Sequence, residues 1–195
     1  LDKIRTSFPA YFVGTGGNGG NQGGTETPDN PVVPDVPVTP PAGGNGAYQQ
    51  VTSLSEITAG GNFVVAVLYE GKYIVLDTTF ATKPTGKEGG TGALTVANLP
   101  VWTFAAAEAG VTMASGGKYL SYVTSTNFAN NSSAYPWSIA AGETAGTFRI
   151  YSGDRYICYQ YSDDGTTVRN RFGMYKTGQK NGVYEYDLYL FKVTE

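Results

Sequence analysis

The feature of this chain that most constrains its fold is a short motif that occurs three times. Each copy combines a glycine-containing turn, a basic residue, a tyrosine and an aliphatic residue: EGKYI at 70–74, GGKYL at 116–120 and GDRYI at 153–157. Glycine adopts positive φ angles readily, and the β-branched and aromatic residues after each turn favour extended backbone. The motif therefore predicts three β-hairpins.

Each predicted hairpin is flanked by further strand-forming segments. A strand leads into each turn at residues 62–68, 110–114 and 146–151, and a closing strand follows at residues 101–104, 136–139 and 188–193. Repeated units usually bury their apolar faces against one another. Two sets of equivalent core positions are therefore expected: Ile74, Leu120 and Ile157, and then Trp102, Trp137 and either Leu190 or Phe191.

Three hairpins with returning strands resemble a β-trefoil, and the turn motif is similar to the hairpin of trefoils in actin-bundling and lectin families. The resemblance implies an all-β, β-trefoil-like threefold barrel over residues 47–195, with a β-sandwich as the alternative. No glutamine lies two residues before Trp102 or Trp137, so the sugar-binding Gln-x-Trp signature of lectin trefoils is missing. Both indole rings are therefore expected in the core.

The N-terminal quarter of the chain has a different character. Residues 1–13 alternate, with Ile4, Thr6 and Phe8 on one face, as in a half-buried strand, and residues 14–46 form a Gly/Pro-rich flexible linker. A lone strand needs a partner for its backbone and its apolar face. We expect it to pair with another copy of the chain, which would build filaments, or alternatively with a preceding domain.

The linker and the following VTSLSEITAGGNFVV segment resemble the modular secreted and surface proteins of Bacteroidota, in which such modules lie at the C-terminus. The resemblance implies an extracellular or cell-surface location. Asp77-Thr78-Thr79 resembles the O-glycosylation acceptor of that phylum, with a turn at the end of a strand as the competing interpretation. Asn130 and Asn131 each fit the Asn-x-Ser/Thr sequon, so Thr78, Asn130 and Asn131 are candidate glycosylation sites.

Several activities are disfavoured by residue types that the chain lacks. It has no histidine and a single cysteine, Cys158, which excludes an intramolecular disulfide, Ser-His and Cys-His pairs and imidazole metal sites. Cys158 is expected to be a small buried residue. A net charge of −3 argues against nucleic-acid binding, and no run of about 20 apolar residues is present to span a membrane. We therefore expect no enzyme, metal or cofactor.

One group of residues is a candidate ligand site. Arg169 and Arg171 alternate along a predicted strand and could hold a carboxylate or an anionic sugar. The competing interpretation is an exposed strand face whose charge is balanced by acidic residues in an SDDG turn. The candidate residues are Tyr159, Tyr161, Asp163, Asp164, Arg169 and Arg171.

The sequence is compatible with two functions. The first is a non-catalytic extracellular assembly module, such as a filament or surface-layer subunit joined through its N-terminal strand. The second is a carbohydrate-binding module of a larger secreted protein, with tyrosine rings against sugar faces.

Local patterns predict the remaining elements. Ser53 should cap one helical turn over residues 53–59. Residues 82–92, 125–135 and 176–183 read as surface loops because they are rich in glycine, asparagine, lysine or threonine, and residues 93–96 as a short strand.

Overall fold

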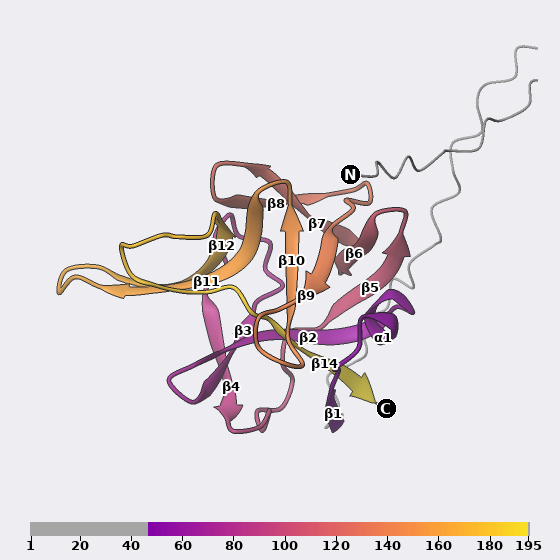
Figure 1. Cartoon of the computed structure of the whole chain (residues 1–195), viewed down its shortest axis with the longest axis horizontal. Helices are drawn as coiled ribbons and strands as arrows, with labels where there is room; N and C mark the ends of the chain where they lie inside the picture. The colour runs from indigo at the N-terminus through magenta and orange to yellow at the C-terminus, as the bar shows by residue number, and fades with distance from the viewer. Residues whose placement is uncertain (1–46, 195) are drawn as a thin grey trace, which may run out of the picture. The chain divides into compact units, whose positions relative to one another are not determined.

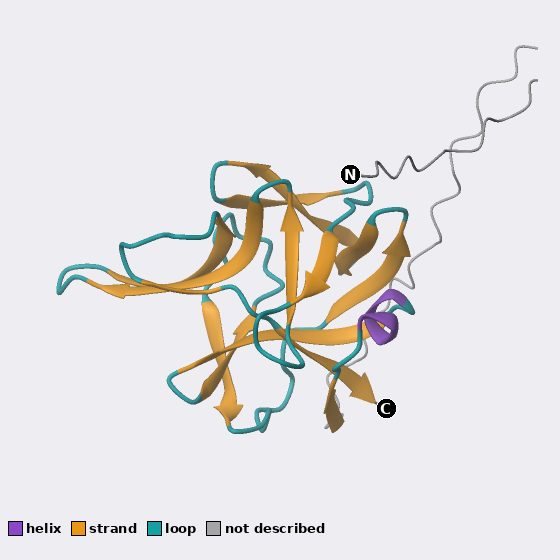
Figure 2. Ribbon diagram, in the orientation of Figure 1, coloured by secondary structure: helices purple, strands orange, loops and turns teal. Residues whose placement is uncertain are grey.

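The computed structural model describes residues 47–194, which fold into an all-β domain with two antiparallel sheets (Figures 1 and 2). The all-β part of the prediction is therefore confirmed. The proposed assembly strand, with Ile4, Thr6 and Phe8, and the linker at 14–46 lie outside the described residues.

The first sheet contains nine strands in this part of the chain, and the second contains five. The first is built from β1 (Ala47–Gln50), β2 (Gly61–Tyr69), β3 (Lys72–Leu76), β4 (Gly86–Thr91), β5 (Trp102–Ala107), β6 (Gly110–Ser115), β7 (Lys118–Thr124), β8 (Asn127–Asn131) and β14 (Tyr189–Thr194). The second is built from β9 (Ser138–Ala141), β10 (Phe148–Ser152), β11 (Arg155–Asp163), β12 (Val168–Tyr175) and β13 (Val183–Glu185).

All three repeats of the motif form hairpins, in β2–β3, β6–β7 and β10–β11. The motif tyrosines occupy the same register, because each pairs with the residue five positions before it: Leu68 pairs with Tyr73, Ala114 with Tyr119 and Tyr151 with Tyr156. In the second hairpin, Gly116 and Gly117 have φ angles of 55° and 74°. Both central positions of such a turn require positive φ, which explains the paired glycines.

The closing strands return to the first strand of each unit. Trp102 lies opposite Phe63, Trp137 forms an isolated bridge with Val111, and Leu188 forms one with Phe148. The last two bridges connect the two sheets. Val111 and Phe148 each lie three residues before the partner of the motif tyrosine, whereas Phe63 lies five residues before it, so Leu188 matches Trp137 in register. The expected matches, Leu190 and Phe191, instead pair with Val65 and Val64 of β2.

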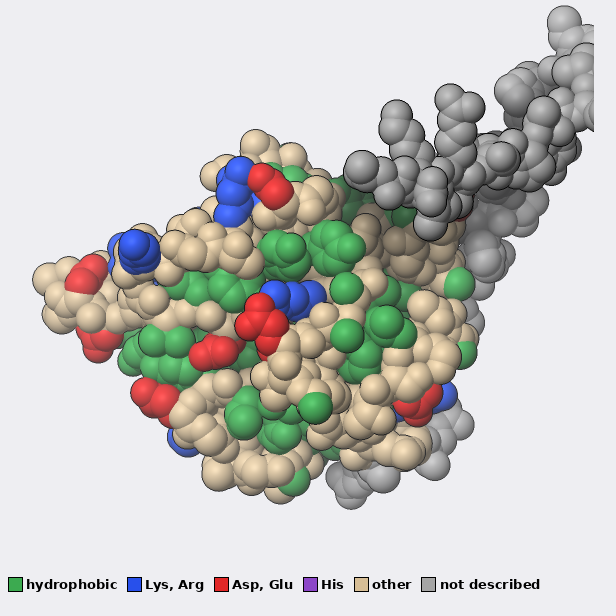
Figure 3. Space-filling view, in the orientation of Figure 1, with side chains coloured by type: hydrophobic (Ala, Val, Ile, Leu, Met, Phe, Trp, Pro, Cys, Tyr) green, Lys and Arg blue, Asp and Glu red, His purple; other side chains and the backbone are tan. Residues whose placement is uncertain are grey.

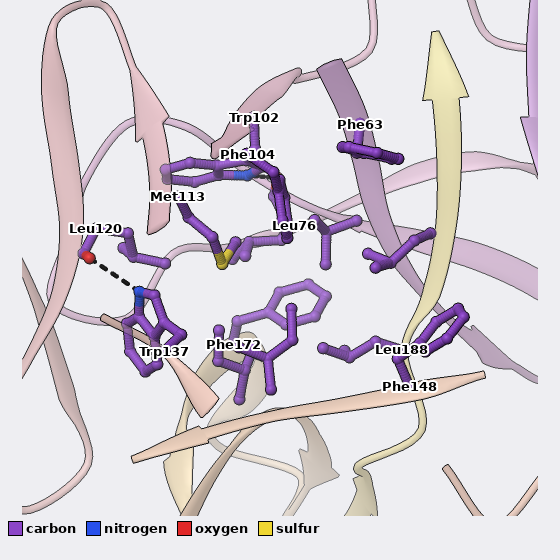
Figure 4. Close-up of a cluster of buried hydrophobic side chains, with 14 of the residues drawn as sticks. Phe63, Leu76, Trp102, Phe104, Met113, Leu120, Trp137, Phe148, Phe172 and Leu188 are labelled. Carbon is purple, nitrogen blue, oxygen red and sulfur yellow. Dashed lines mark hydrogen bonds between the residues drawn. The ribbon is translucent and has the colours of Figure 1, made fainter. Parts of the chain in front are cut away.

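The core is organised around the two tryptophans, whose side chains are fully buried (Figure 4). Each indole Nε1–H donates to a backbone carbonyl, that of Leu76 at 3.3 Å for Trp102 and that of Leu120 at 3.0 Å for Trp137. These bonds satisfy the one polar atom of each ring. Core packing of both tryptophans is thus confirmed. The three motif aliphatics join the same buried cluster: Ile74, Leu120 and Ile157.

Two segments that read as loops contain strands. β4 pairs with β3 although it is half glycine in composition. A Cβ atom at Gly86 would lie 2.4 Å from Cγ2 of Ile74, so glycine is what lets β4 lie this close. β8 pairs with β7 and buries a single large side chain, Phe128. The predictions failed because the partner strand, and not local propensity, decides these two elements.

The predicted strand at 93–96 is also absent from the described structure. The backbone instead folds back on β4, and the N–H groups of Thr95 and Val96 both donate to the carbonyl of Gly89, at 2.9 and 3.2 Å. A bent segment with these bonds cannot extend into a ladder.

The predicted helical turn is present as α1 (Leu54–Thr58). Ser53 is its N-cap, and the Ser53 hydroxyl accepts from the Ser55 N–H at 3.2 Å. Within residues 47–194, no helix has the length and apolar character needed to cross a membrane. Cys158 is buried and unpaired in β11, as expected.

Candidate functional site

A pocket of about 1000 Å³ lies against the second sheet, where the β11–β12 hairpin extends away from the rest of the domain (Figure 1). Its walls come from β11, β12 and residues 179–184, with Tyr69, Lys83 and Thr126 from neighbouring segments. Acidic and basic side chains lie together on the surface over this hairpin (Figure 3). The predicted ligand residues that line the pocket are Tyr161, Asp163, Asp164, Arg169 and Arg171.

The register of the β11–β12 ladder decides which side chains can act together. Arg171 lies opposite Gln160 and Arg169 opposite Ser162, whereas Tyr161 lies opposite Asn170. Directly opposed residues of an antiparallel pair project on the same face, and neighbours along a strand alternate. The two arginines therefore share one face, and Tyr159 and Tyr161 lie on the other. The arginines and tyrosines therefore do not share one strand face, because the register that separates them is not evident from the sequence. Tyr161 nevertheless lines the same pocket as both arginines, whereas Tyr159 does not.

Tyr159 belongs to the core and does not line the pocket. Its ring packs against Phe172 at 5.4 Å and Tyr69 at 5.6 Å between centroids. Burial, together with the nearby Tyr69, Tyr161 and Glu70, raises the pKa of Tyr159 to about 12, so its phenol stays neutral. Tyr161 is half-buried, with its ring 5.1 Å from that of Tyr69. This face supplies an aromatic margin to the pocket.

The arginine face is organised by Gln160, whose side chain is almost completely buried at 2% exposure. Its Oε1 accepts from Arg171 Nε at 3.0 Å and from the Tyr175 hydroxyl at 2.8 Å. Its Nε2 donates to the Tyr184 hydroxyl at 2.8 Å, which in turn donates to Asn181 Oδ1 at 2.5 Å. A buried amide with both ends bonded is fixed in place, so the side chains that it contacts are fixed too.

The two acidic residues serve the turn between β11 and β12. Asp163 Oδ1 accepts from the Gly165 N–H at 2.8 Å. Asp164 Oδ1 accepts from the Thr166 hydroxyl at 2.6 Å and from the N–H groups of Thr166 and Thr167 at 3.0 and 2.8 Å. These hydrogen bonds, with a contribution from the charge of Arg169, lower the pKa of Asp164 to about 2. The acidic residues therefore serve a turn, as expected, but the turn lies at 164–167, because Ser162 and Asp163 pair with Arg169 and Val168 in the ladder.

The two arginines differ in how their charge is balanced. Arg169 Nη1 lies 3.2 Å from Ser162 Oγ and 3.4 Å from Asp164 Oδ2. Arg171 has no carboxylate partner among the described residues. Of the two arginines, only Arg169 therefore has a carboxylate nearby that balances its charge.

Lys83 is a member of the site that the sequence does not suggest, because it lies 88 positions before Arg171. The segment between β3 and β4 carries it to the edge of β12, where Phe172 N–H donates to the Pro84 carbonyl at 2.7 Å and Thr85 bridges to Arg171. Burial lowers the pKa of Lys83, and the positive charges of Arg171 and Arg169 lower it further. Lys83 forms no ion pair with any residue in the described part of the chain.

The candidate glycosylation residues lie elsewhere. Thr78 is half-buried, and its N–H donates to Asp77 Oδ1 at 2.8 Å, which is a turn contact at the end of β3. Asn130 and Asn131 are exposed at the end of β8, and Asn131 Oδ1 accepts from the Ser133 N–H at 3.1 Å. Glycosylation at these positions stays a prediction.

Comparison of the chain with protein-family models, with curated proteins and with solved structures gave no match. Among residues 47–194, no group of three or more acidic or cysteine side chains is arranged to hold a metal ion.

Proposed function

We propose that residues 47–194 form a non-catalytic carbohydrate-binding module of an extracellular or cell-surface protein. The observation that carries this proposal is the Gln160 network, which fixes Arg171 and Tyr184 at the wall of an open pocket of about 1000 Å³. Sugar sites combine aromatic surface with a few fixed polar groups. Tyr69, Tyr161 and Tyr184 supply half-buried rings here, and Tyr175 lies almost completely buried behind them.

A β-trefoil-like scaffold is part of the same proposal. It is supported by the identical register of the three motif tyrosines and by the three closing positions, Trp102, Trp137 and Leu188, each opposite the first strand of its own unit. The isolated bridges Val111–Trp137 and Phe148–Leu188 join the two sheets, as continuous strand pairing around a threefold barrel requires.

The pocket offers little for hydrolysis, which supports a binding role. Glycosidases need a carboxylic acid with a raised pKa opposite a second carboxylate. The carboxylates that line this pocket are Asp163 and Asp164, and both accept hydrogen bonds within one turn. The pKa of Asp164 is lowered to about 2, which is the wrong direction for a general acid.

A glycan array tests the proposal directly. The full chain should bind at least one class of carbohydrate, and Arg171→Ala should remove that binding. Lys118→Ala is the matched control, because Lys118 is an exposed cation in the β6–β7 hairpin away from the pocket. Binding to no glycan, or equal binding by the Arg171 variant, would contradict the proposal.

Assembly through the N-terminal strand is the second candidate. One observation favours it: β1 pairs with β14 on one side and has no second partner strand among the described residues. An open edge of this kind can accept a strand from another copy.

A further inference from the structure

The pocket contains an excess of positive charge in a chain whose net charge is −3. Its cationic side chains are Lys83, Arg155, Arg169 and Arg171, against the two carboxylates of the turn. Arg155 donates to the Met174 carbonyl at 3.2 Å, and Arg169 lies next to Asp164. Lys83, Arg155 and Arg171 have no acidic partner among residues 47–194, and of these Lys83 and Arg171 lie near each other in the pocket.

Arg171 is oriented before any ligand arrives. Its Nε–H is bonded to Gln160, and Gln160 is bonded in turn to Tyr175 and Tyr184. The Arg171 side chain also forms a hydrogen bond with Tyr175, and the remaining N–H groups of its guanidinium can pair with carboxylate oxygens. Because the side chain is already ordered, little conformational entropy is lost on binding.

Lys83 brings a second positive charge to the same place. Holding two cations near each other in a half-buried position is unfavourable, and the lowered pKa of Lys83 reflects both burial and the neighbouring arginines. A bound anion removes this repulsion. The pair therefore behaves as a site built for a negative group.

The pocket is much larger than a free carboxylate. The Tyr175 and Tyr184 rings lie 5.1 Å apart between centroids, on the same face as Arg171. Gln179 and Asn181 add amide groups on the adjoining loop, which can donate to and accept from hydroxyl groups. This combination fits a sugar ring that carries an acid.

We infer that Arg171 and Lys83 together bind the carboxylate of a hexuronic acid residue in an acidic glycan. Arg171 forms the paired hydrogen bonds, Lys83 supplies a second charge, and Tyr184 with the 179–181 loop contacts the sugar ring and its hydroxyls. This inference rests on the proposed carbohydrate-binding function and assigns the class of sugar.

Titration calorimetry on the full chain tests the inference with four uronate oligosaccharides: galacturonate, glucuronate, mannuronate and guluronate. Each is paired with its methyl ester, which keeps the ring but removes the charge, and a sulfated neutral oligosaccharide is the third arm. At least one uronate should bind, and its ester should bind more than about tenfold more weakly, since a paired charge-assisted hydrogen bond is lost.

The variants locate the contact. Lys83→Ala and Arg171→Gln should each weaken uronate binding by about tenfold or more and leave ester binding nearly unchanged, whereas Lys118→Ala should bind as the unmodified chain does. A uronate and its ester that bind equally, preference for the sulfated sugar, or no uronate binding would overturn the inference. Binding to neutral sugars alone would overturn it while the proposed function stands, and binding to no sugar at all would end both.

Discussion

Gln160 holds Arg171 in place through a 3.0 Å hydrogen bond from the arginine Nε to the amide Oε1. The amide is 2% exposed, whereas Arg171 lies at the wall of the pocket. A buried residue of the sheet thus sets the position of a charged group at the surface. The contact depends on the β11–β12 register, because only that register places the two residues directly opposite each other.

Replacing Gln160 should separate stability from binding. Gln160→Leu removes the acceptor of the Tyr175 hydroxyl and of Arg171 Nε, and the donor to the Tyr184 hydroxyl. We therefore expect a loss of about 1–3 kcal/mol in the free energy of unfolding, measured by urea denaturation. Gln160→Glu keeps a hydrogen-bond acceptor for Arg171, but its carboxylate balances the positive charge of the arginine. That variant should stay closer to the original stability and lose affinity for anionic sugars. Normal anion binding by Gln160→Glu would contradict the role assigned to Arg171.

The hydrogen bond of the Trp137 indole should contribute to the stability of the domain, as does the volume of the ring. Trp137→Phe removes the donor to the Leu120 carbonyl and leaves a small cavity in the buried cluster. We expect a loss of about 2–4 kcal/mol in the free energy of unfolding. Val123→Ala is the control, since Val123 is 58% exposed and should change stability by less than about 0.5 kcal/mol. Equal effects of the two variants would show that this part of the core is misassigned.

β4 should tolerate no side chain at Gly86. The Cβ of alanine there would lie 2.4 Å from Ile74 Cγ2 and 2.5 Å from Asn170 Oδ1, so the core must shift. A cost of about 1–3 kcal/mol is expected for Gly86→Ala, from thermal or urea unfolding. Gly92→Ala is the comparison: nothing lies within 4 Å of that Cβ, and only the φ of 71° opposes the change, at about 1–2 kcal/mol. A smaller effect at position 86 than at position 92 would contradict the packing of β4.

The parts of the fold that the sequence predicts are those set by nearby residues. The hairpins follow from a turn and the strands on either side of it, and Ser53 caps α1 through a contact two residues away. β4 and β8 were missed because distant partner strands hold them. Glycine and asparagine propensities argue against both strands, and the ladder outweighs them.

The site shows the same division. Arg169, Arg171 and the SDDG turn lie within one hairpin and could be singled out from the sequence. The register of the two strands does not follow from the sequence, which predicts Tyr159 and Tyr161 beside the arginines, whereas the ladder places both tyrosines on its other face. Lys83 reaches the pocket through a segment between two other strands, and its position depends on the tertiary fold alone.

Asp187 should make the domain sensitive to acid. Burial raises the pKa of its carboxyl, but hydrogen bonds from the backbone near Thr144 and from Arg149 Nε, at 2.7 and 2.9 Å, outweigh burial and lower it overall. A lowered folded pKa gives stability that is present above the unfolded value of about 4 and is lost as the pH falls below it. Asp187→Asn should therefore be less stable at pH 7, with a difference that shrinks towards pH 2. A difference that is constant with pH would exclude this carboxylate as the cause.

Removing the N-terminal strand should change the size of particles in solution if residues 1–13 join copies of the chain. Ile4 and Phe8 alternate onto one face in the sequence, so Ile4→Asp with Phe8→Asp should abolish pairing, whereas Ser7→Asp, on the other face, should not. Light scattering over a range of concentrations measures the effect. We expect the full chain to associate, with deletion of 1–13 leaving a monomer that still binds sugar, because the pocket lies within residues 69–184. A full chain that is monomeric at high concentration would rule out strand donation.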